Sequence, residues 1–234
     1  LCPLKDYYRY FLKVPEDLKT KEVDLNTTQK GTLLHEALNL AHHQAQAKSE
    51  DLIEAVLAQS GYDASDTLKA ELKKQLKDYL QSPAFKNINQ AQEILSEFPF
   101  ILKLKSGQVR GQIDRLILKD DHWLLVDFKF TQKHAGLKEI KAAYDFQLKT
   151  YSLAAWRAFA KKPKVEVHLL AQTKVVALDY SEAELETHQK LLEKIQNQKN
   201  QQKAMPEVEF RKHCYECAYA RELSLCPVGL SRLS

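Results

Sequence analysis

The sequence predicts an α/β protein in which a central mixed β-sheet is flanked by helices. Three observations favour this class. Apolar residues recur with helical spacing over much of residues 1–90, they alternate with polar residues in segments from residue 98 onward, and a long helical segment separates the first strands from the last. We therefore predict one domain over residues 1–234, made of a helical part (1–90), an α/β core (91–205) and a cysteine-bearing tail (206–234).

The helical part contains four predicted segments. Residues 3–13 are rich in Tyr, Phe and Leu, and residues 31–48 carry apolar side chains three and four positions apart, the spacing of one helix face. Ser49 is placed to cap a third helix that ends near Gly61. A fourth helix is predicted over residues 66–80, because a Ser-Pro pair follows it and stops it.

The predicted sheet begins with three strands. Residues 98–105 alternate until a Ser-Gly pair breaks the pattern, which is typical of a strand that ends in a turn. Residues 109–118 and 123–130 are two further strands around the polar segment Lys-Asp-Asp-His. The spacing therefore predicts consecutive hairpins in the middle of the chain.

The remaining core elements follow in order. A long helix is predicted from residue 137 to residue 160, and residues 165–171 and 175–180 form another strand pair. The segment Ser-Glu-Ala-Glu at residues 181–184 is a capping box that begins the last helix. This helix becomes rich in Lys and Gln by Lys203, which we interpret as a solvated face or linker.

The composition narrows the function classes. Hydrophobic residues make up 44% and charged residues 28% of the 234, and the net charge of +4 permits nucleic acid as a partner without requiring it. The 6 glycines form neither a phosphate-binding P-loop nor a dinucleotide fingerprint. No signal peptide opens the chain and no run approaches the roughly 18 apolar residues of a membrane span, so we expect a cytoplasmic protein. Because the only Met is Met205, we expect a domain of a longer protein.

The hairpin of the second and third strands places two carboxylates and an ammonium together. If its turn is residues 119–122, residue numbers paired across it sum to 241, and Asp114 lies opposite Asp127. Such a pair projects to one face with Cβ atoms roughly 4.5–5.5 Å apart, and Lys129, two positions further on, shares that face. The apolar neighbours are expected to point the other way, into the core: Ile113, Ile117, Val126, Phe128 and Phe130.

Facing carboxylates repel each other, and partial burial increases that repulsion. In one interpretation both are solvated and Lys129 is their counter-ion. The strongly apolar flanks instead indicate central strands, in which a bound cation has to compensate for the charge. Because oxygen ligands suit Mg²⁺ or Mn²⁺, we interpret this face as a site for one of these ions.

These residues carry a resemblance to a known family. Gly111-x-x-Asp114 followed by Asp127-Phe128-Lys129 resembles the paired motifs of the PD-(D/E)XK nuclease superfamily, and more narrowly its RecB-type nuclease domains. Three further segments resemble the pattern of that family in the same order along the chain, namely Gly31-Thr32-Leu33-Leu34-His35, Glu97-Phe98-Pro99-Phe100 and Gln147-Leu148-Lys149-Thr150-Tyr151. The resemblance implies a restriction-endonuclease-like fold.

The resemblance also implies a metal site. Asp114, Asp127, His35 and the backbone carbonyl of Phe128 would hold the ion, which would polarise the scissile phosphate and lower the pKa of a bound water. Lys129 would orient that water or offset the negative charge that develops on the phosphate.

Other matched residues would assist. Glu97 would serve a second ion or a ligand water, while Gln147 and Tyr151, at positions i and i+4 of one helix face, would support the site or position DNA. Several lysines are either phosphate contacts or solvated surface residues: Lys133, Lys138, Lys141 and Lys149.

The chain contains four cysteines, Cys2, Cys214, Cys217 and Cys226. Disulfides are disfavoured in the cytosol, and a Cys-x-x-Cys pair suits a metal. The arrangement resembles the iron–sulfur staple of AddB-type nuclease domains, in which the four thiolates would hold a structural [4Fe–4S] cluster and join the two ends of the chain. Zinc, or no metal and a disulfide, are alternatives, because spacing alone does not separate them.

The residues and the resemblance together predict a Mg²⁺- or Mn²⁺-dependent deoxyribonuclease that acts as an exonuclease. The resemblance places it in an AddAB/RecBCD-like helicase–nuclease that processes double-strand breaks. Its DNA single strands would come from a superfamily 1 helicase or from a helicase-like partner, and no membrane partner is expected. One alternative is a CRISPR-adaptation or stand-alone repair exonuclease. Another is a nuclease-dead DNA-binding scaffold, against which the complete set of Asp114, Asp127, Lys129 and His35 argues.

Overall fold

The structure is a computed structural model. It describes residues 2–6, 25, 27–43, 47–62, 64–131 and 136–201, together with single residues of the C-terminal segment, Glu209, Cys214, Cys217 and Cys226. The contacts divide the chain into two compact units, one made of residues 1–23 and 197–234 and the other of residues 24–196. The prediction of a single domain over residues 1–234 stays a prediction, and each unit is described by itself.

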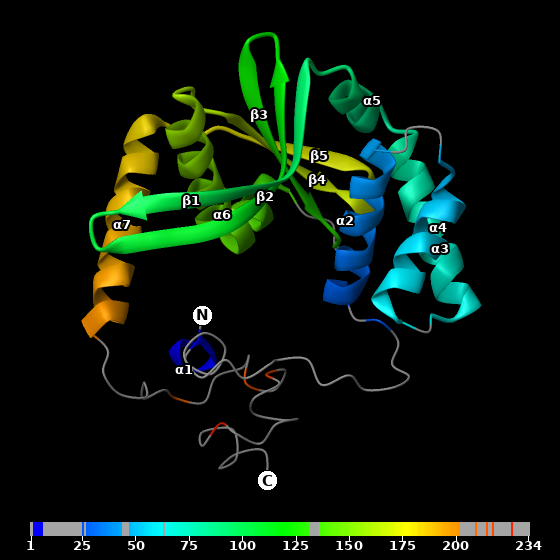
Figure 1. Ribbon diagram of the computed structural model, residues 1–234, viewed down its shortest axis with the longest axis horizontal. Helices are drawn as coiled ribbons and strands as arrows, with labels where there is room; N and C mark the ends of the chain where they lie inside the picture. The colour runs from blue at the N-terminus through cyan, green and yellow to red at the C-terminus, as the bar shows by residue number, and fades with distance from the viewer. Residues whose placement is uncertain are drawn as a thin grey trace. The chain divides into compact units, whose positions relative to one another are not determined.

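The larger unit is built on one five-stranded sheet in the order β1-β2-β3-β4-β5 (Figure 1). The strands are β1 (Glu93–Leu104), β2 (Gly107–Lys119), β3 (His122–Lys129), β4 (Lys164–Leu169) and β5 (Lys174–Leu178). Neighbouring strands are antiparallel except for β3 and β4, which are parallel. The long helix α6 (Leu137–Phe159) provides the crossover that a parallel pair needs. The sheet is therefore mixed, and the predicted fold class is confirmed.

Helices cover both faces of this sheet (Figure 1). One apolar core lies between the sheet and α2 (Thr27–His43), α3 (Ser49–Ser60), α4 (Asp66–Leu80) and α5 (Pro83–Asn89). The second core lies between the sheet, α6 and α7 (Glu182–Gln201). Burial on both faces explains why the strands are rich in Val, Ile and Leu rather than strictly alternating.

Local sequence rules account for most helix ends. Gly61 adopts the left-handed conformation after α3, as expected for a C-terminal glycine, and α4 has the predicted bounds with Ser65 as its N-cap. Ser49 does not cap α3, because it is the first helical residue and Lys48 occupies the cap position. The Ser-Pro pair stops α4 as predicted but also begins α5, since Ser82 accepts a hydrogen bond from the backbone of Phe85.

The strands are longer than the sequence predicts at their polar ends. β1 begins at Glu93 and β2 at Gly107, because the backbone pairing of the two strands continues through their half-buried and exposed ends. The β2–β3 turn is only two residues, Asp120 and Asp121, both with left-handed backbone, which is the geometry of a type I′ hairpin. The predicted capping box is confirmed, with Ser181 and Glu184 exchanging side-chain hydrogen bonds at the start of α7.

The smaller unit contains the short helix α1 (Pro3–Asp6) and all four cysteines. The rest of the helix predicted over residues 3–13, the candidate phosphate contact Lys133, the polar run around Lys203 and most of the tail lie outside the described residues. None of the described helices is long and apolar enough to cross a membrane.

Candidate active site

The first of the two predicted acids, Asp114, lies at an interruption in strand β2, and the second, Asp127, lies in β3. Pairs between β2 and β3 do sum to 241, as predicted, but the pairing ends at Arg115–Val126, one position before Asp114. Pairing with β1 also skips this position, between Ser96–Arg115 and Phe98–Ile113. The carboxylate of Asp114 instead accepts a hydrogen bond from the backbone N–H of Phe128 at 2.9 Å. The side chain of Asp114 therefore takes the place of a backbone carbonyl as the hydrogen-bond acceptor for Phe128.

This interruption corrects one prediction about the faces of the hairpin. Ile117, Val126 and Phe128 pack in the core beneath α2–α5, as expected for one face. Ile113 packs instead in the core beneath α6, although regular alternation would place it with Ile117. The alternation of side chains must therefore change between these two residues, next to Asp114.

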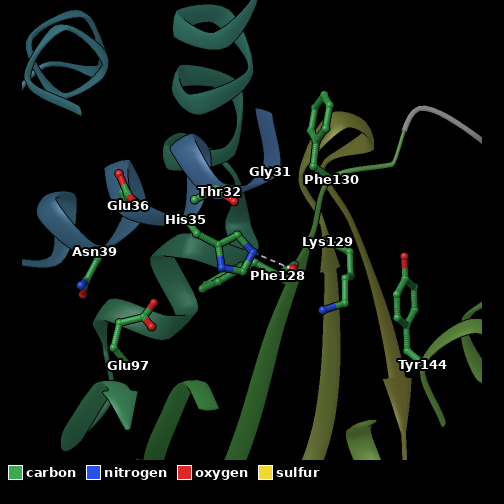
Figure 2. A pocket seen from close by; sticks show the side chains of 10 residues that line it. All are labelled: Gly31, Thr32, His35, Glu36, Asn39, Glu97, Phe128, Lys129, Phe130 and Tyr144. Carbon is green, nitrogen blue, oxygen red and sulfur yellow. Dashed lines mark hydrogen bonds between the residues drawn. The ribbon is translucent and has the colours of Figure 1, made fainter. Parts of the chain in front are cut away.

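His35 joins this group from helix α2. Its Nε2 lies 2.7 Å from the carbonyl oxygen of Phe128 (Figure 2). Its Nδ1 lies 3.5 Å from Oδ2 of Asp114. A carbonyl only accepts, so Nε2 carries the proton of that hydrogen bond. In a neutral imidazole Nδ1 then presents a lone pair toward a carboxylate, an arrangement that a cation between them would stabilise.

Asp127 and Lys129 form a buried ion pair beside this group. Nζ of Lys129 lies 2.7 Å from Oδ2 of Asp127, whose side chain is 0% exposed. Burial raises the pKa of Asp127 to about 6, and the nearby charge of Asp114 adds to the increase while Lys129 opposes it. Burial alone would lower the pKa of Lys129, but the carboxylates of Asp127 and Asp114 outweigh it and raise that pKa. Burial and the repulsion from Asp114 therefore disfavour the charged form of Asp127, and a cation in addition to Lys129 would stabilise it.

Glu97 faces the same interruption from β1. Its backbone is left-handed, with φ of 49°, which is unusual for a residue without special turn chemistry. Burial and the charge of Asp114 raise the pKa of its carboxyl. The structure thus places Glu97 within the electrostatic influence of Asp114, while its role toward a second ion or a ligand water stays a prediction.

Four further motif residues contact one another in sequence. A Cβ added to Gly111 would lie 2.5 Å from the ring of Phe100, so this position has to be glycine for the ring to lie across β2. The Phe100 ring in turn meets the ring of Tyr151 edge-on at 5.7 Å. Tyr151 accepts a hydrogen bond from Gln147 at 2.9 Å, so the predicted shared helix face is confirmed, while the role of this pair stays a prediction.

A cavity of about 680 Å³ opens beside these groups, and Figure 2 shows its walls. Its lining comes from helix α2, from Glu97 of β1, from Phe128 and Lys129 of β3 with Phe130 directly after it, and from Tyr144 of α6. Tyr144 was not among the predicted site residues, although its position one helical turn before Gln147 could have indicated it. Four of the five elements that carry the family-like motifs therefore line the cavity.

Arg115 is a second residue that the sequence analysis missed. Its side chain is buried, at 1% exposure, and reaches helix α2, where Nη2 donates to the carbonyl of Leu38 at 3.2 Å. Its guanidinium carbon lies 5.3 Å from the centre of the Phe128 ring. Burial lowers the pKa of Arg115, and nearby acids oppose that shift. This arginine ties the helix of His35 to the strand of Phe128, which no local pattern predicts.

The residues present fit a divalent cation. Oδ1 of Asp127 is buried and accepts no hydrogen bond from the described residues, so a carboxylate oxygen is left without a positive partner. The other candidate ligands are Oδ2 of Asp114, Nδ1 of His35 and the carbonyl of Phe128. The described part of the chain holds no preformed group of three or more His, Cys, Asp or Glu side chains spaced to bind a metal, so these atoms would have to rearrange around an ion.

The cysteines do not form disulfides. Cys214, Cys217 and Cys226 are buried and Cys2 is partly buried, all within the smaller unit. The backbone of Cys217 donates to the carbonyl of Cys214, which closes a turn across the Cys-x-x-Cys pair. An iron–sulfur cluster stays a prediction.

Comparison with known proteins gives a family-level match. The family model of the PD-(D/E)XK nuclease superfamily matches residues 1–226, nearly the whole chain. The chain is also 36% identical over 98 residues to an ATP-dependent helicase/nuclease subunit from Carboxydothermus hydrogenoformans. That alignment covers 36% of this chain and only 8% of the relative, so the chain corresponds to a small part of it.

Among solved structures, the chain is similar to a candidate exonuclease from Eubacterium rectale. The TM-score is 0.51 with 12% sequence identity, over 92% of this chain and 85% of that one. At this identity the likeness supports the fold alone.

Proposed function

The chain belongs to the PD-(D/E)XK nuclease superfamily, and from this premise we propose that it is a Mg²⁺- or Mn²⁺-dependent deoxyribonuclease that degrades DNA from its ends. The observation that carries the proposal is the convergence of His35, Asp114 and Phe128 next to the buried pair of Asp127 and Lys129. Carboxylates, an imidazole and a carbonyl can hold a divalent ion, and an ammonium can offset the charge that develops on a phosphate during hydrolysis.

In the proposed mechanism Asp114, Asp127, His35 and the carbonyl of Phe128 would hold the ion. The ion would supply polarisation of the scissile phosphate and a lower pKa for an attacking water. Lys129 directs its ammonium at the charge that develops on the phosphate oxygens.

The neighbouring groups act through their charge and shape. Because burial and the charge of Asp114 raise the pKa of Glu97, its carboxylate is a stronger base than that of an exposed glutamate, and we propose that it accepts a proton from water. Gln147 and Tyr151 orient each other and the substrate strand.

Cleavage assays test this proposal. Purified protein with Mg²⁺ or Mn²⁺ is expected to shorten end-labelled linear DNA, and the variants Asp127→Ala and Lys129→Ala are expected to lose roughly 10²–10³-fold or more of the rate. Lys162→Ala is the matched control, because it removes an ion pair with Asp179 of similar length outside the site. Full activity of the Asp127 or Lys129 variant would contradict the assigned site.

We further propose that this nuclease works as part of an AddAB/RecBCD-like helicase–nuclease in the repair of double-strand breaks in the cytoplasm. The similarity to part of a helicase/nuclease protein supports this. A superfamily 1 helicase would then deliver single strands to the cavity. The test is co-purification of the full-length parent protein with a helicase, together with ATP-dependent degradation of duplex ends. A parent that degrades duplex ends alone without ATP would favour the stand-alone repair exonuclease instead.

The four cysteines are proposed to hold a structural [4Fe–4S] cluster. The burial of Cys214, Cys217 and Cys226 in the same unit as Cys2, without disulfides, supports this. Anaerobically purified protein is expected to be brown and to absorb near about 400 nm. A colourless protein that contains one equivalent of zinc would contradict the cluster and favour zinc.

A further inference from the structure

We propose that Tyr144 is the positioning residue of Lys129 and holds its ammonium in place when a divalent ion occupies Asp127. This inference rests on the proposed nuclease function and deepens it. Tyr144 belongs to none of the motifs that the family resemblance identifies, and it lies on a different element, helix α6, from the lysine that it contacts.

The contact is made through the face of the aromatic ring. Nζ of Lys129 lies 5.0 Å from the centre of the Tyr144 ring, within the range of a cation–π interaction. Among the described residues the hydroxyl of Tyr144 has no hydrogen-bond partner, so the ring accounts for its contact with Lys129. In Figure 2 the two side chains lie next to each other on the wall of the cavity.

Lys129 needs this second partner because its first one is shared. Its ammonium is 2.7 Å from Oδ2 of Asp127, the carboxylate that is also proposed to bind the ion. Two cations at one carboxylate repel each other, so a divalent ion would weaken the hold of Asp127 on Lys129. The side chain of Lys129 is 16% exposed and has a long flexible stem, so without another partner it would lose its orientation toward the phosphate.

An aromatic ring suits this task better than another carboxylate would. It attracts the ammonium without neutralising the charge that the phosphate needs, and it does not compete for the divalent ion. Tyr144 is half-buried in the cavity wall, where partial exclusion of water strengthens the contact.

The first test is nuclear magnetic resonance on the whole chain, with lysine labelled at the ε-carbon and the Lys129 signal assigned by Lys129→Arg. The ring current of Tyr144 is expected to shift this signal upfield, and the shift should persist in Mg²⁺. It should remain in Tyr144→Phe and vanish in Tyr144→Leu. A signal that is the same in the wild type and in Tyr144→Leu would overturn the proposal even if the protein cleaves no DNA.

The second test is kinetic. Tyr144→Leu is expected to lower kcat by roughly 5- to 30-fold, the rate equivalent of a desolvated cation–π contact, with KM and the Mn²⁺ dissociation constant unchanged. Tyr144→Phe should retain kcat, and phenylalanine analogues with more fluorine at position 144 should lower it stepwise. Phe146→Leu, an exposed aromatic on the same helix, is the control and should have no effect.

These outcomes separate the two proposals. If kcat does not depend on the number of fluorine atoms on the ring, or if Tyr144→Phe lowers kcat as much as Tyr144→Leu, Tyr144 has a packing role. Either result would contradict this inference. An inactive wild type would contradict the proposed function, and the resonance of Lys129 would still decide on the contact.

Discussion

The β2–β3 hairpin has two ends that follow different rules. At the turn end, Leu118 pairs with Trp123 and Lys119 with His122, and a two-residue type I′ turn closes the ladder. At the acid end the ladder stops, and Asp114 uses its side chain to bind the backbone of the partner strand. The same two strands are therefore regular at one end and interrupted at the other.

The two ends differ in how their acidic side chains affect the stability of the fold. The charged side chain Asp121, at the turn, is exposed and paired with Lys161. Asp127, at the acid end, is fully buried with a raised pKa and an oxygen that no described donor reaches. Groups that repel each other without a cation and attract one when it arrives are typical of functional sites.

The largest expected effect is on the DNA cleavage rate, when the charge of Asp114 is removed. Asp114→Asn preserves the size of the side chain but removes its charge, so the DNA cleavage rate is expected to fall by roughly 10²–10³-fold. Asp121→Asn makes the same change at the turn of the same hairpin and is expected to leave the rate unchanged. Equal effects on the cleavage rate would show that the two ends do not differ in function.

The second prediction concerns stability and pH without metal. The pKa of Asp127 is raised to about 6, so the folded state holds its proton more tightly than the unfolded state, and the free energy of unfolding falls as pH rises from about 4 to about 6. Asp127→Asn removes this titration, so its free energy of unfolding is expected to fall less than that of the wild type over the same pH range.

Urea unfolding at both pH values, with a chelator present, measures this difference. A variant whose free energy of unfolding falls as steeply with pH as that of the wild type would contradict the raised pKa of Asp127. Addition of Mg²⁺ is expected to raise the stability of the wild type more than that of the variant.

The third prediction tests how packing supports the acid end. Gly111→Ala forces the Phe100 ring away, because the new Cβ would lie 2.5 Å from it, and is expected to cost about 1–3 kcal/mol of stability. Because that ring also contacts Tyr151, cleavage should slow as well. The double variant Gly111→Ala with Phe100→Leu, measured by thermal unfolding, should recover part of the loss, and simple additivity would contradict the packing explanation.

The smallest effect is expected at the turn. Asp120→Asn places the residue that type I′ turns favour at a left-handed position and should raise the free energy of unfolding by less than about 0.5 kcal/mol, with cleavage unchanged. Denaturant unfolding combined with the cleavage assay checks both quantities. A loss of activity here would show that the turn communicates with the acid end.

The two ends of the hairpin also differ in how well the sequence predicted them. Register arithmetic from the turn predicted the pairing of β2 with β3 correctly, because pairing near a tight turn is fixed by the turn itself. It failed for Ile113, because it assumes regular alternation and Asp114 interrupts the strand. The resemblance of the motifs predicted that His35 lies near Asp114. It did not predict the contacts of Arg115 with Leu38 and of Tyr144 with Lys129, because these depend on how side chains pack between neighbouring elements.

The most direct test of the central claim is to locate a metal ion in the acid end of the hairpin. Crystals soaked in Mn²⁺ and measured at the manganese absorption edge are predicted to show an anomalous peak between the carboxylates of Asp114 and Asp127, next to the carbonyl of Phe128. Absence of a peak there at saturating Mn²⁺, in crystals of protein that cleaves DNA in solution, would contradict the account.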